Sequence, residues 1–259
     1  MEFISSTSNR KIKDLLALQQ KSSVRRERGL FTVEGERELE HCIRAGFEAD
    51  SIFFCPEIYG KDVEALGCAK TFAVSKEIYD KIAYRGGTEG IIAEVRTKSA
   101  TLQGLEVGEN PLIVVLESVE KPGNLGAVLR SADAAGADAV IVCDPLTDLY
   151  NPNLIRASIG AVFTVPVVAC TSREAIDWLV SKRIRIYTAQ LQDSAWYYDT
   201  DMKEGTAIVM GTESTGLTDI WRQAADAHIK IPMLGRLDSL NVSVSAAILL
   251  FEAVRQRNG

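Results

Sequence analysis

PLIVVLES (111–118), a helix-like segment (124–136) and ADAVIVC (137–143) follow one another in the middle of the chain. The first of these is almost continuously apolar, as expected of a strand that is buried on both faces. Asn124 is a candidate N-cap for the helix and Gly136 a candidate end. A strand, a helix and a second strand at this spacing predict a parallel sheet covered by helices, and hence an α/β fold.

The same alternation continues on both sides of this unit. Further strand candidates are 30–35, 51–55, 70–75, 90–97, 162–168, 184–191, 206–211 and 228–232. Further helix candidates are 8–20, 35–46, 60–68, 76–84, 152–160, 172–183, 216–225 and 240–257. The polar, weakly periodic stretch 98–110 predicts a linker between a smaller α/β domain, 1–97, and a larger one, 111–259.

Composition excludes several classes of protein. Hydrophobic residues make up 46% of the chain and charged residues 25%, which is typical of a folded globular protein. No apolar run reaches membrane-spanning length and the start of the chain does not resemble a secretion signal, so we expect a cytoplasmic protein and no membrane partner. Five cysteines without a CxxC pair, and only two histidines, predict neither disulfides nor a metal site.

The charge distribution is uneven along the chain. The net charge is −6, which by itself does not favour binding to nucleic acid. Residues 1–30, however, hold seven Lys or Arg against three acidic residues. This excess indicates either a solvated surface or a contact with RNA phosphates, and charge alone does not decide between the two.

A first candidate site segment is 117–130, which follows the buried strand at 111–118. Ligands of α/β proteins collect at the carboxyl ends of parallel strands, so the place suits a site. Asn124 lies at the expected mouth of the helix, Gly126 allows a close approach, and Arg130 is within reach. The alternative is a capped helix that carries one exposed arginine.

A second segment, 209–217, is a strand that ends in a loop bounded by Gly211 and Gly216. No Lys-Ser/Thr pair follows Gly216, so a loop that binds nucleoside triphosphates is excluded. The alternative is a tight strand-to-helix turn with Glu213 in solvent.

The third segment, 229–247, places small and polar residues at the start of a long apolar helix. Ser239 or Asn241 can cap this helix. The small side chains that follow allow close packing against another element or against a second copy of the helix.

Together the three segments resemble the motifs of the SpoU/TrmH family of RNA ribose 2′-O-methyltransferases, within the SPOUT superfamily. The positions that carry this resemblance are Asn124, Gly126, Arg130, Gly211, Glu213, Gly216, Leu217, Ile231, Pro232, Met233, Ser239, Leu240, Asn241, Val242 and Ser243. The resemblance covers about 111–257. A looser likeness, carried by Phe31–Gly35 and the helix after it, relates 1–97 to the family's RNA-substrate-binding domain.

The resemblance implies a cofactor, a fold and partners. It implies that 184–257 threads a loop to form a deep trefoil knot, which pattern reasoning alone does not predict. S-adenosylmethionine is then expected in that knot, held near Thr188, Ala189, Gln190, Leu191, Met210, Gly211, Glu213, Ile231, Met233, Ser239 and Leu240. The implied partners are RNA, with ribosomal RNA favoured over transfer RNA, and a second copy of the chain bound through the C-terminal helix.

The resemblance also implies catalytic roles for Arg130, Asn124, Glu213 and Asn241. The donor's methyl is activated by a sulfonium, so the reaction needs alignment and stabilisation of the 2′-oxygen rather than a metal. Arginine is very hard to deprotonate, so we expect Arg130 to stay charged and to bind a phosphate and the developing oxyanion. Asn124 would orient Arg130 or the ribose, Glu213 would pair with Arg130 or position the cofactor, and Asn241 would hold the loop.

Rival functions remain open at this point. A Rossmann-type methyltransferase requires a G-x-G turn after the first strand, where this sequence has ESVEKPGNLG (117–126). A nucleotide-using enzyme is disfavoured by the missing phosphate-loop lysine. A transfer RNA methyltransferase, or a non-catalytic RNA-binding protein of the same fold, stays possible, and the sequence does not identify the RNA or its modified nucleotide.

Overall fold

The computed structural model describes residues 2–84, 89–212 and 214–259. Its contacts divide the chain into two compact units. The first unit comprises 1–99 and 148–164, and the second comprises 100–147 and 165–259. Residues 148–164 therefore pack with the first unit, although the sequence division assigned them to 111–259.

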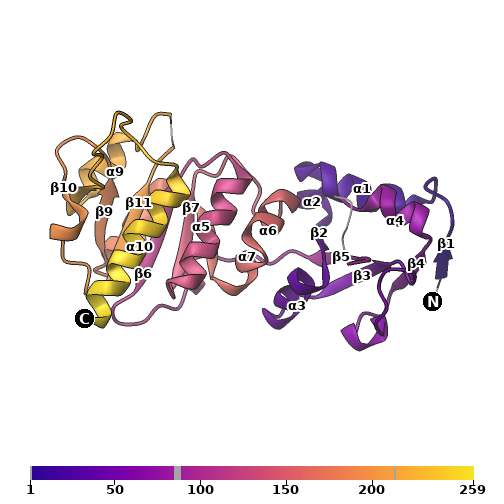
Figure 1. Ribbon diagram of the computed structural model, residues 1–259. Helices are drawn as coiled ribbons and strands as arrows, with labels where there is room; N and C mark the ends of the chain where they lie inside the picture. Colours follow the sequence, from indigo (N-terminus) through magenta and orange to yellow (C-terminus); the bar gives the residue numbers. More distant parts are fainter. Residues whose placement is uncertain (1, 85–88, 213) are drawn as a thin grey trace. The chain divides into compact units, whose positions relative to one another are not determined.

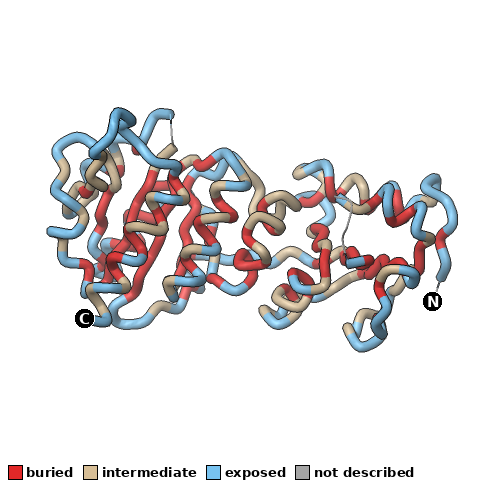
Figure 2. The backbone as a smooth tube through the Cα atoms, in the orientation of Figure 1, coloured by how far each residue is buried: buried red, intermediate tan, exposed pale blue. Residues whose placement is uncertain are grey.

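The first unit is built on a five-stranded mixed sheet in the order β1-β4-β3-β5-β2. Its strands are β1 (Glu2–Ile4), β2 (Leu30–Glu34), β3 (Ala49–Phe54), β4 (Thr71–Val74) and β5 (Ile91–Arg96). β5 runs antiparallel to both β2 and β3, whereas β4 is parallel to β1 and β3. Its central strands are mostly buried (Figure 2).

Helices cover this sheet and come from two parts of the sequence. They are α1 (Arg10–Gln20), α2 (Ser22–Arg28), α3 (Glu36–Arg44), the 3-10 turn η1 (Val63–Leu66), α4 (Lys76–Ile82), α6 (Pro152–Ser158) and α7 (Ala161–Thr164). Arg25 fixes the long-range packing of α6: it is 4% exposed, and its Nε donates to Asp148 Oδ2 at 2.6 Å. A buried arginine needs such a partner, which explains why the segment that starts at Asp148 is held here.

The second unit is a seven-stranded sheet in the order β10-β12-β9-β11-β6-β7-β8, and each described pairing is parallel. Its strands are β6 (Leu112–Glu117), β7 (Ala139–Cys143), β8 (Val167–Cys170), β9 (Arg185–Ala189), β10 (Ala195–Trp196), β11 (Thr206–Met210) and β12 (Ala227–Lys230). Every residue of β6, β7 and β11 is buried. The expectation of an α/β fold with a parallel sheet covered on both faces is confirmed.

Helices cover both faces of this sheet (Figure 1). They are α5 (Pro122–Ala134), α8 (Ser172–Ser181), α9 (Asp219–Ala224) and α10 (Val242–Asn258), and a 3-10 turn, η2 (Leu102–Gly104), precedes the sheet. Helix α10 lies beside α5 and contacts β11, whereas α8 packs against α9. The core under α8 and α9 includes the fully buried Trp221.

Two expectations about local structure were wrong. Helix α5 begins at Pro122 with Lys121 as its N-cap, so Asn124 lies in the first turn instead of capping it. Proline is favoured at the first helical position because its fixed φ suits a helix and its missing N–H has no partner there. The strand expected at 162–168 is helix α7 followed by Pro166, and β8 begins only at Val167.

Candidate functional site

The carboxyl ends of the central strands of the second unit meet at one edge of its sheet. There β9, β11 and β12 lead into the loops 190–194, 211–218 and 231–241. Because these strands are parallel neighbours, side chains far apart in sequence converge at this edge. The resulting site lies wholly within the second unit.

A cavity of about 710 Å³ opens among these loops. It is lined by Ala189, Gln190, Leu191, Gln192, Met210, Gly211, Thr212, Ser214, Thr215, Gly216, Leu217, Arg222, Ile229, Lys230, Ile231, Met233, Asp238, Ser239, Leu240, Asn241, Val242, Ser245 and Leu249. The cavity is within the size range of small-molecule and cofactor sites.

Most residues expected at the cofactor lie on this cavity. The structure brings together Ala189, Gln190, Leu191, Met210, Gly211, Ile231, Met233, Ser239 and Leu240. Thr188 is not on the wall: it is fully buried, and its Oγ1 is 2.6 Å from His228 Nδ1. Glu213 lies outside the described residues.

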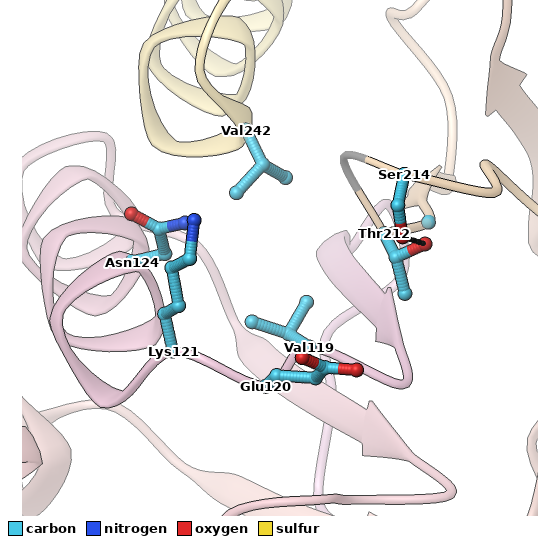
Figure 3. Close-up of a pocket in the computed structure, with 8 residues that line it drawn as sticks. Val119, Glu120, Lys121, Asn124, Thr212, Ser214 and Val242 are labelled. Atoms are coloured by element: carbon cyan, nitrogen blue, oxygen red, sulfur yellow. Dashed lines mark hydrogen bonds between the residues drawn. The ribbon is translucent and has the colours of Figure 1, made fainter.

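A smaller cavity of about 170 Å³ adjoins the first, and the two share Gly211, Thr212, Ser214 and Val242. Figure 3 shows Lys121 and Asn124, from the start of α5, facing Thr212 and Ser214 across it. The smaller cavity therefore joins the first motif segment to the second.

Asn241 connects the third segment to the first. Its Nδ2 donates to Asn124 Oδ1 at 3.2 Å, while its Oδ1 accepts from Ser243 N at 3.0 Å and from Ser243 Oγ at 2.6 Å. The last contacts make Asn241 the N-cap of α10, as one of the two expected choices. One side chain thus starts the long helix and fixes the orientation of the Asn124 amide.

Gly211 is required by the close approach of two backbone segments. A Cβ on this residue would lie 2.6 Å from Leu217 N and closer still to the carbonyl group of Gly216. The loop closes on itself here, since Gly216 N donates to Thr212 O at 3.0 Å. A side chain at 211 would force this loop, and the cavity wall that it forms, to move.

A buried carboxylate for which the sequence analysis predicted no role holds the end of the same loop through hydrogen bonds. Glu117, at the end of β6, is 3% exposed. Its Oε2 accepts from Thr218 N at 2.8 Å, and its Oε1 accepts from Thr218 Oγ1 at 2.6 Å and from Ser172 Oγ at 3.2 Å. Trp221 Nε1 donates to the same Ser172 hydroxyl at 3.0 Å. Glu117 therefore connects the first segment to Thr218, the residue directly after the second segment.

Arg130, one of the expected catalytic residues, does not lie at either cavity. It lies on α5 with its side chain exposed, and it lines neither cavity. Nor do the described residues contain a group of three or more histidine, cysteine, aspartate or glutamate side chains placed to hold a metal ion.

A family model matches most of the second unit. Residues 111–251 match the SpoU rRNA Methylase family, and residues 9–93 match the MRM3-like substrate binding domain. The chain belongs to the SpoU rRNA methylase family. The three motif segments around the cavity all lie within the matched region.

Relatives of this SpoU chain are similar over almost their whole length. The 23S rRNA (guanosine-2′-O-)-methyltransferase RlmB of Vibrio vulnificus is 34% identical over 89% of this chain and 94% of the relative. The 23S rRNA (guanosine(2553)-2′-O)-methyltransferase RlmP of Bacillus subtilis is 28% identical over 97% and 98%. The crystal structure of the SpoU methyltransferase AviRb of Streptomyces viridochromogenes with the cofactor AdoMet is 29% identical, with a TM-score of 0.88 over 96% of this chain and 99% of that one.

Among the described residues, no helix combines the length and apolar character needed to cross a membrane.

Proposed function

We propose that this chain transfers a methyl group from S-adenosylmethionine to a ribose 2′-hydroxyl of ribosomal RNA. The observation that carries the proposal is the cavity of about 710 Å³ at the ends of β9, β11 and β12, lined by the second and third motif segments. Relatives of similar length are named as 23S rRNA 2′-O-methyltransferases, which favours ribosomal over transfer RNA.

The residues on the cavity fit S-adenosylmethionine. Gln190 Oε1 is buried there with no hydrogen-bond partner among the described residues, so it can accept from a bound donor such as an amine. Met210, Leu240 and Leu249 offer apolar surface, and Gly211 lets backbone approach closely. When bound, the cofactor supplies a methyl group that its sulfonium has already activated.

We assign the catalytic roles to Asn124, Asn241, Arg130 and Glu213. The hydrogen bond from Asn241 to Asn124 supports a role in orienting the ribose at the smaller cavity, because it fixes which end of the Asn124 amide faces outwards. Arg130 keeps its charge, binds a substrate phosphate and stabilises the developing oxyanion. The proton of the 2′-hydroxyl then passes to a phosphate oxygen or to water, and Glu213 pairs with Arg130 or positions the cofactor.

The chain works as a homodimer that associates through α10. Support comes from the apolar side chains that this helix exposes: Val244 is 46% exposed and Phe251 47%. Helix α5 packs beside α10, so a partner docked on α10 would lie next to Arg130. That neighbourhood would explain why Arg130 lines neither cavity of its own chain.

We assign the remaining architecture by the same resemblance. Residues 1–97 bind the RNA substrate, 98–110 link the domains, and 111–259, apart from 148–164, which pack with the first unit, form the methyltransferase domain with a trefoil knot within 184–257. The match of 9–93 to a substrate binding domain supports the first assignment. We assign the enzyme to the cytoplasm, in keeping with a ribosomal RNA substrate.

The test is transfer of radiolabel from S-adenosylmethionine to RNA of a strain that lacks the gene, with ribosomal and transfer RNA assayed separately. We expect label in ribosomal RNA with the wild type, and a loss of at least about 100-fold in Arg130→Ala. Arg130→Lys should also be poorly active because lysine keeps the charge but not the fork of donors. Arg173→Lys, on the exposed surface of α8, is the matched control and should keep full activity.

Each other outcome has a definite meaning. Label in transfer RNA alone would refute the ribosomal substrate but keep the chemistry. An Arg130→Lys enzyme as fast as the wild type would refute the bidentate role. No label in either RNA, together with no binding of S-adenosylmethionine by calorimetry, would refute the methyltransferase proposal and leave a non-catalytic RNA-binding protein.

A further inference from the structure

A third cavity lies within the first unit, separate from the two cavities of the methyltransferase site. Its volume is about 220 Å³, below the usual range for drug-sized ligands. The end of β2, helix α3, the residue Glu89 before β5, and helix α6 contribute its walls. The β2 residues belong to the Phe31–Gly35 stretch that marks this domain in the sequence.

One buried polar atom on this cavity lacks the partner that it needs. Arg156 Nη1 is buried and has no hydrogen-bond partner among the described residues, although Nη2 donates to Asn153 Oδ1 at 3.3 Å. Thr32, only 2% exposed, lines the same cavity. Because buried polar groups in native proteins are almost always hydrogen-bonded, the unpartnered guanidinium nitrogen points to a ligand.

Carboxylate side chains also line this cavity. Glu38 is 7% exposed, and its Oε1 accepts from Arg37 Nη2 at 2.8 Å. Glu34 Oε2 accepts from Tyr84 N at 2.7 Å, and Glu89 Oε2 accepts from Glu36 N. These contacts hold the carboxylates in place on the cavity wall.

This combination excludes two simple kinds of ligand. A free phosphate or another anion would face several carboxylates in a confined space and would be repelled. A metal cation would face the guanidinium of Arg156 on the same cavity. A neutral occupant that offers hydrogen-bond donors to the carboxylates beside an acceptor for Arg156 fits both sets of side chains.

Among the RNA bases, guanine alone presents two adjacent donors, N1–H and N2–H₂, beside an acceptor, O6. A carboxylate accepts from both donors at once, and an arginine donates to O6 or N7. Sequence-specific RNA recognition takes hold of such unstacked bases, often with an aromatic or guanidinium plane beside them. Tyr84 is 40% exposed on this cavity, and the guanidinium carbon of Arg156 lies 5.6 Å from its ring centroid.

We propose that this cavity binds one unstacked guanine base of the RNA substrate. Glu38 accepts from N1–H and N2–H₂, Arg156 donates to O6, and Thr32 supplies the remaining hydroxyl. The proposal rests on the proposed function, because it takes RNA as the substrate. It assigns to the first unit a base-specific contact separate from the methylated ribose.

The test uses the full-length protein and short single-stranded oligoribonucleotides that carry guanosine or inosine at one position. Inosine lacks only the N2 amino group, and the dissociation constant is measured by fluorescence anisotropy. We expect inosine to bind about 5- to 100-fold more weakly than guanosine, which corresponds to the worth of one good base contact. In Glu38→Gln this preference should fall to about 2-fold or less. Arg156→Lys should weaken the binding of both oligomers by a similar factor, because inosine keeps the O6 that Arg156 contacts.

Two further variants test a second lining residue and provide a control outside the cavity. Thr32→Val removes the hydroxyl on this cavity and should bind guanosine more weakly than the wild type does. Glu40→Gln lies on the same helix, pairs with Arg44 and is absent from the cavity wall, so it should keep the full preference.

The outcomes also separate this proposal from the methyltransferase activity. Equal binding of guanosine and inosine by the wild type, no measurable binding of either oligomer, or a preference that survives in Glu38→Gln, would overturn the guanine site. If the same preparation still methylates ribosomal RNA, only the cavity proposal fails. If it methylates no RNA at all, the proposed function fails, whichever oligomer binds.

Discussion

Replacing Gly211 with alanine should damage cofactor binding more than any other single methyl group added near the site. The new Cβ would lie 2.6 Å from Leu217 N, whereas ordinary contacts begin at 3.4 Å, and it would lie closer still to the Gly216 carbonyl. Backbone atoms cannot rotate away as a side chain can. The loop must therefore open by roughly 1 Å, which lengthens the 3.0 Å hydrogen bond from Gly216 N to Thr212 O.

The expected cost follows from two contributions. Overpacking costs about 1–3 kcal/mol, and loss of one backbone hydrogen bond costs about 0.5–1.5 kcal/mol. Together they should lower the melting temperature by roughly 4–15 °C. Because the displaced loop forms a wall of the large cavity, affinity for S-adenosylmethionine should fall at least about tenfold, equivalent to 1.4 kcal/mol.

Isothermal titration calorimetry and thermal unfolding of the purified full-length chain measure both effects. Gly123→Ala is the matched control, because a Cβ there meets no atom within 4 Å. Its melting temperature and affinity should equal those of the wild type or exceed them slightly, since alanine favours the first turn of α5. A Gly211→Ala protein with unchanged affinity and melting temperature would refute the argument from close approach.

Other perturbations give equally definite expectations. Glu117→Gln turns an NH₂ toward the donors of Thr218, so the free energy of unfolding measured by urea titration should fall by about 1–3 kcal/mol, whereas the exposed Glu106→Gln should be neutral. Burial raises the pKa of Glu94 above its ordinary 4.5, so ionisation of this carboxyl group destabilises the folded state. The contribution of Glu94 to the free energy of unfolding is therefore fully present below pH 4.5 and is lost as the pH rises through the raised pKa. Glu94→Gln should therefore melt higher than the wild type at alkaline pH, and the difference should vanish in acid; a constant difference would contradict this. Phe251→Glu places a charge on the exposed face of α10. If the proposed dimer forms through this helix, sedimentation should detect a dimer with the wild type and a monomer with the variant at the same concentration, with little change in monomer stability.

The sequence predicts the sheet well where burial alone determines structure. β6, β7 and β11 are apolar throughout, and such runs are hard to place anywhere except in a strand covered on both faces. Local pattern fails at 162–168, where β-branched residues suggested one strand. Pro166 separates the segment into α7 and β8, because proline disfavours helical backbone in the residue before it.

Candidate site residues were predictable where a motif places them on a loop, and not where a contact crosses the chain. The glycine-bounded loop that begins at Gly211 lies on the cavity as expected. No role was predicted for Glu117, at the end of the strand expected at 111–118, because its partner Thr218 is 101 residues away. The signal that could have found it is a carboxylate at the end of an otherwise apolar strand, which requires a donor from another segment. The absence of Arg130 from the cavities likewise depends on three-dimensional packing that no periodicity encodes.

Several basic residues of 1–30 are already used in ion pairs within the chain. Arg25 is buried against Asp148, and Lys11 and Arg28 pair with Glu2 and Asp14 at 2.6 and 2.8 Å.

In contrast, Lys13, Lys21 and Arg26 have no ion pair within the described residues. Each phosphate that such a cation neutralises changes the slope of log affinity against log salt by only about 0.7–0.9. With so few cations available in this segment, a general electrostatic attraction cannot supply much specificity. Discrimination among RNAs then depends on contacts to individual bases, which is the role that we propose for the cavity beside Thr32 and Arg156.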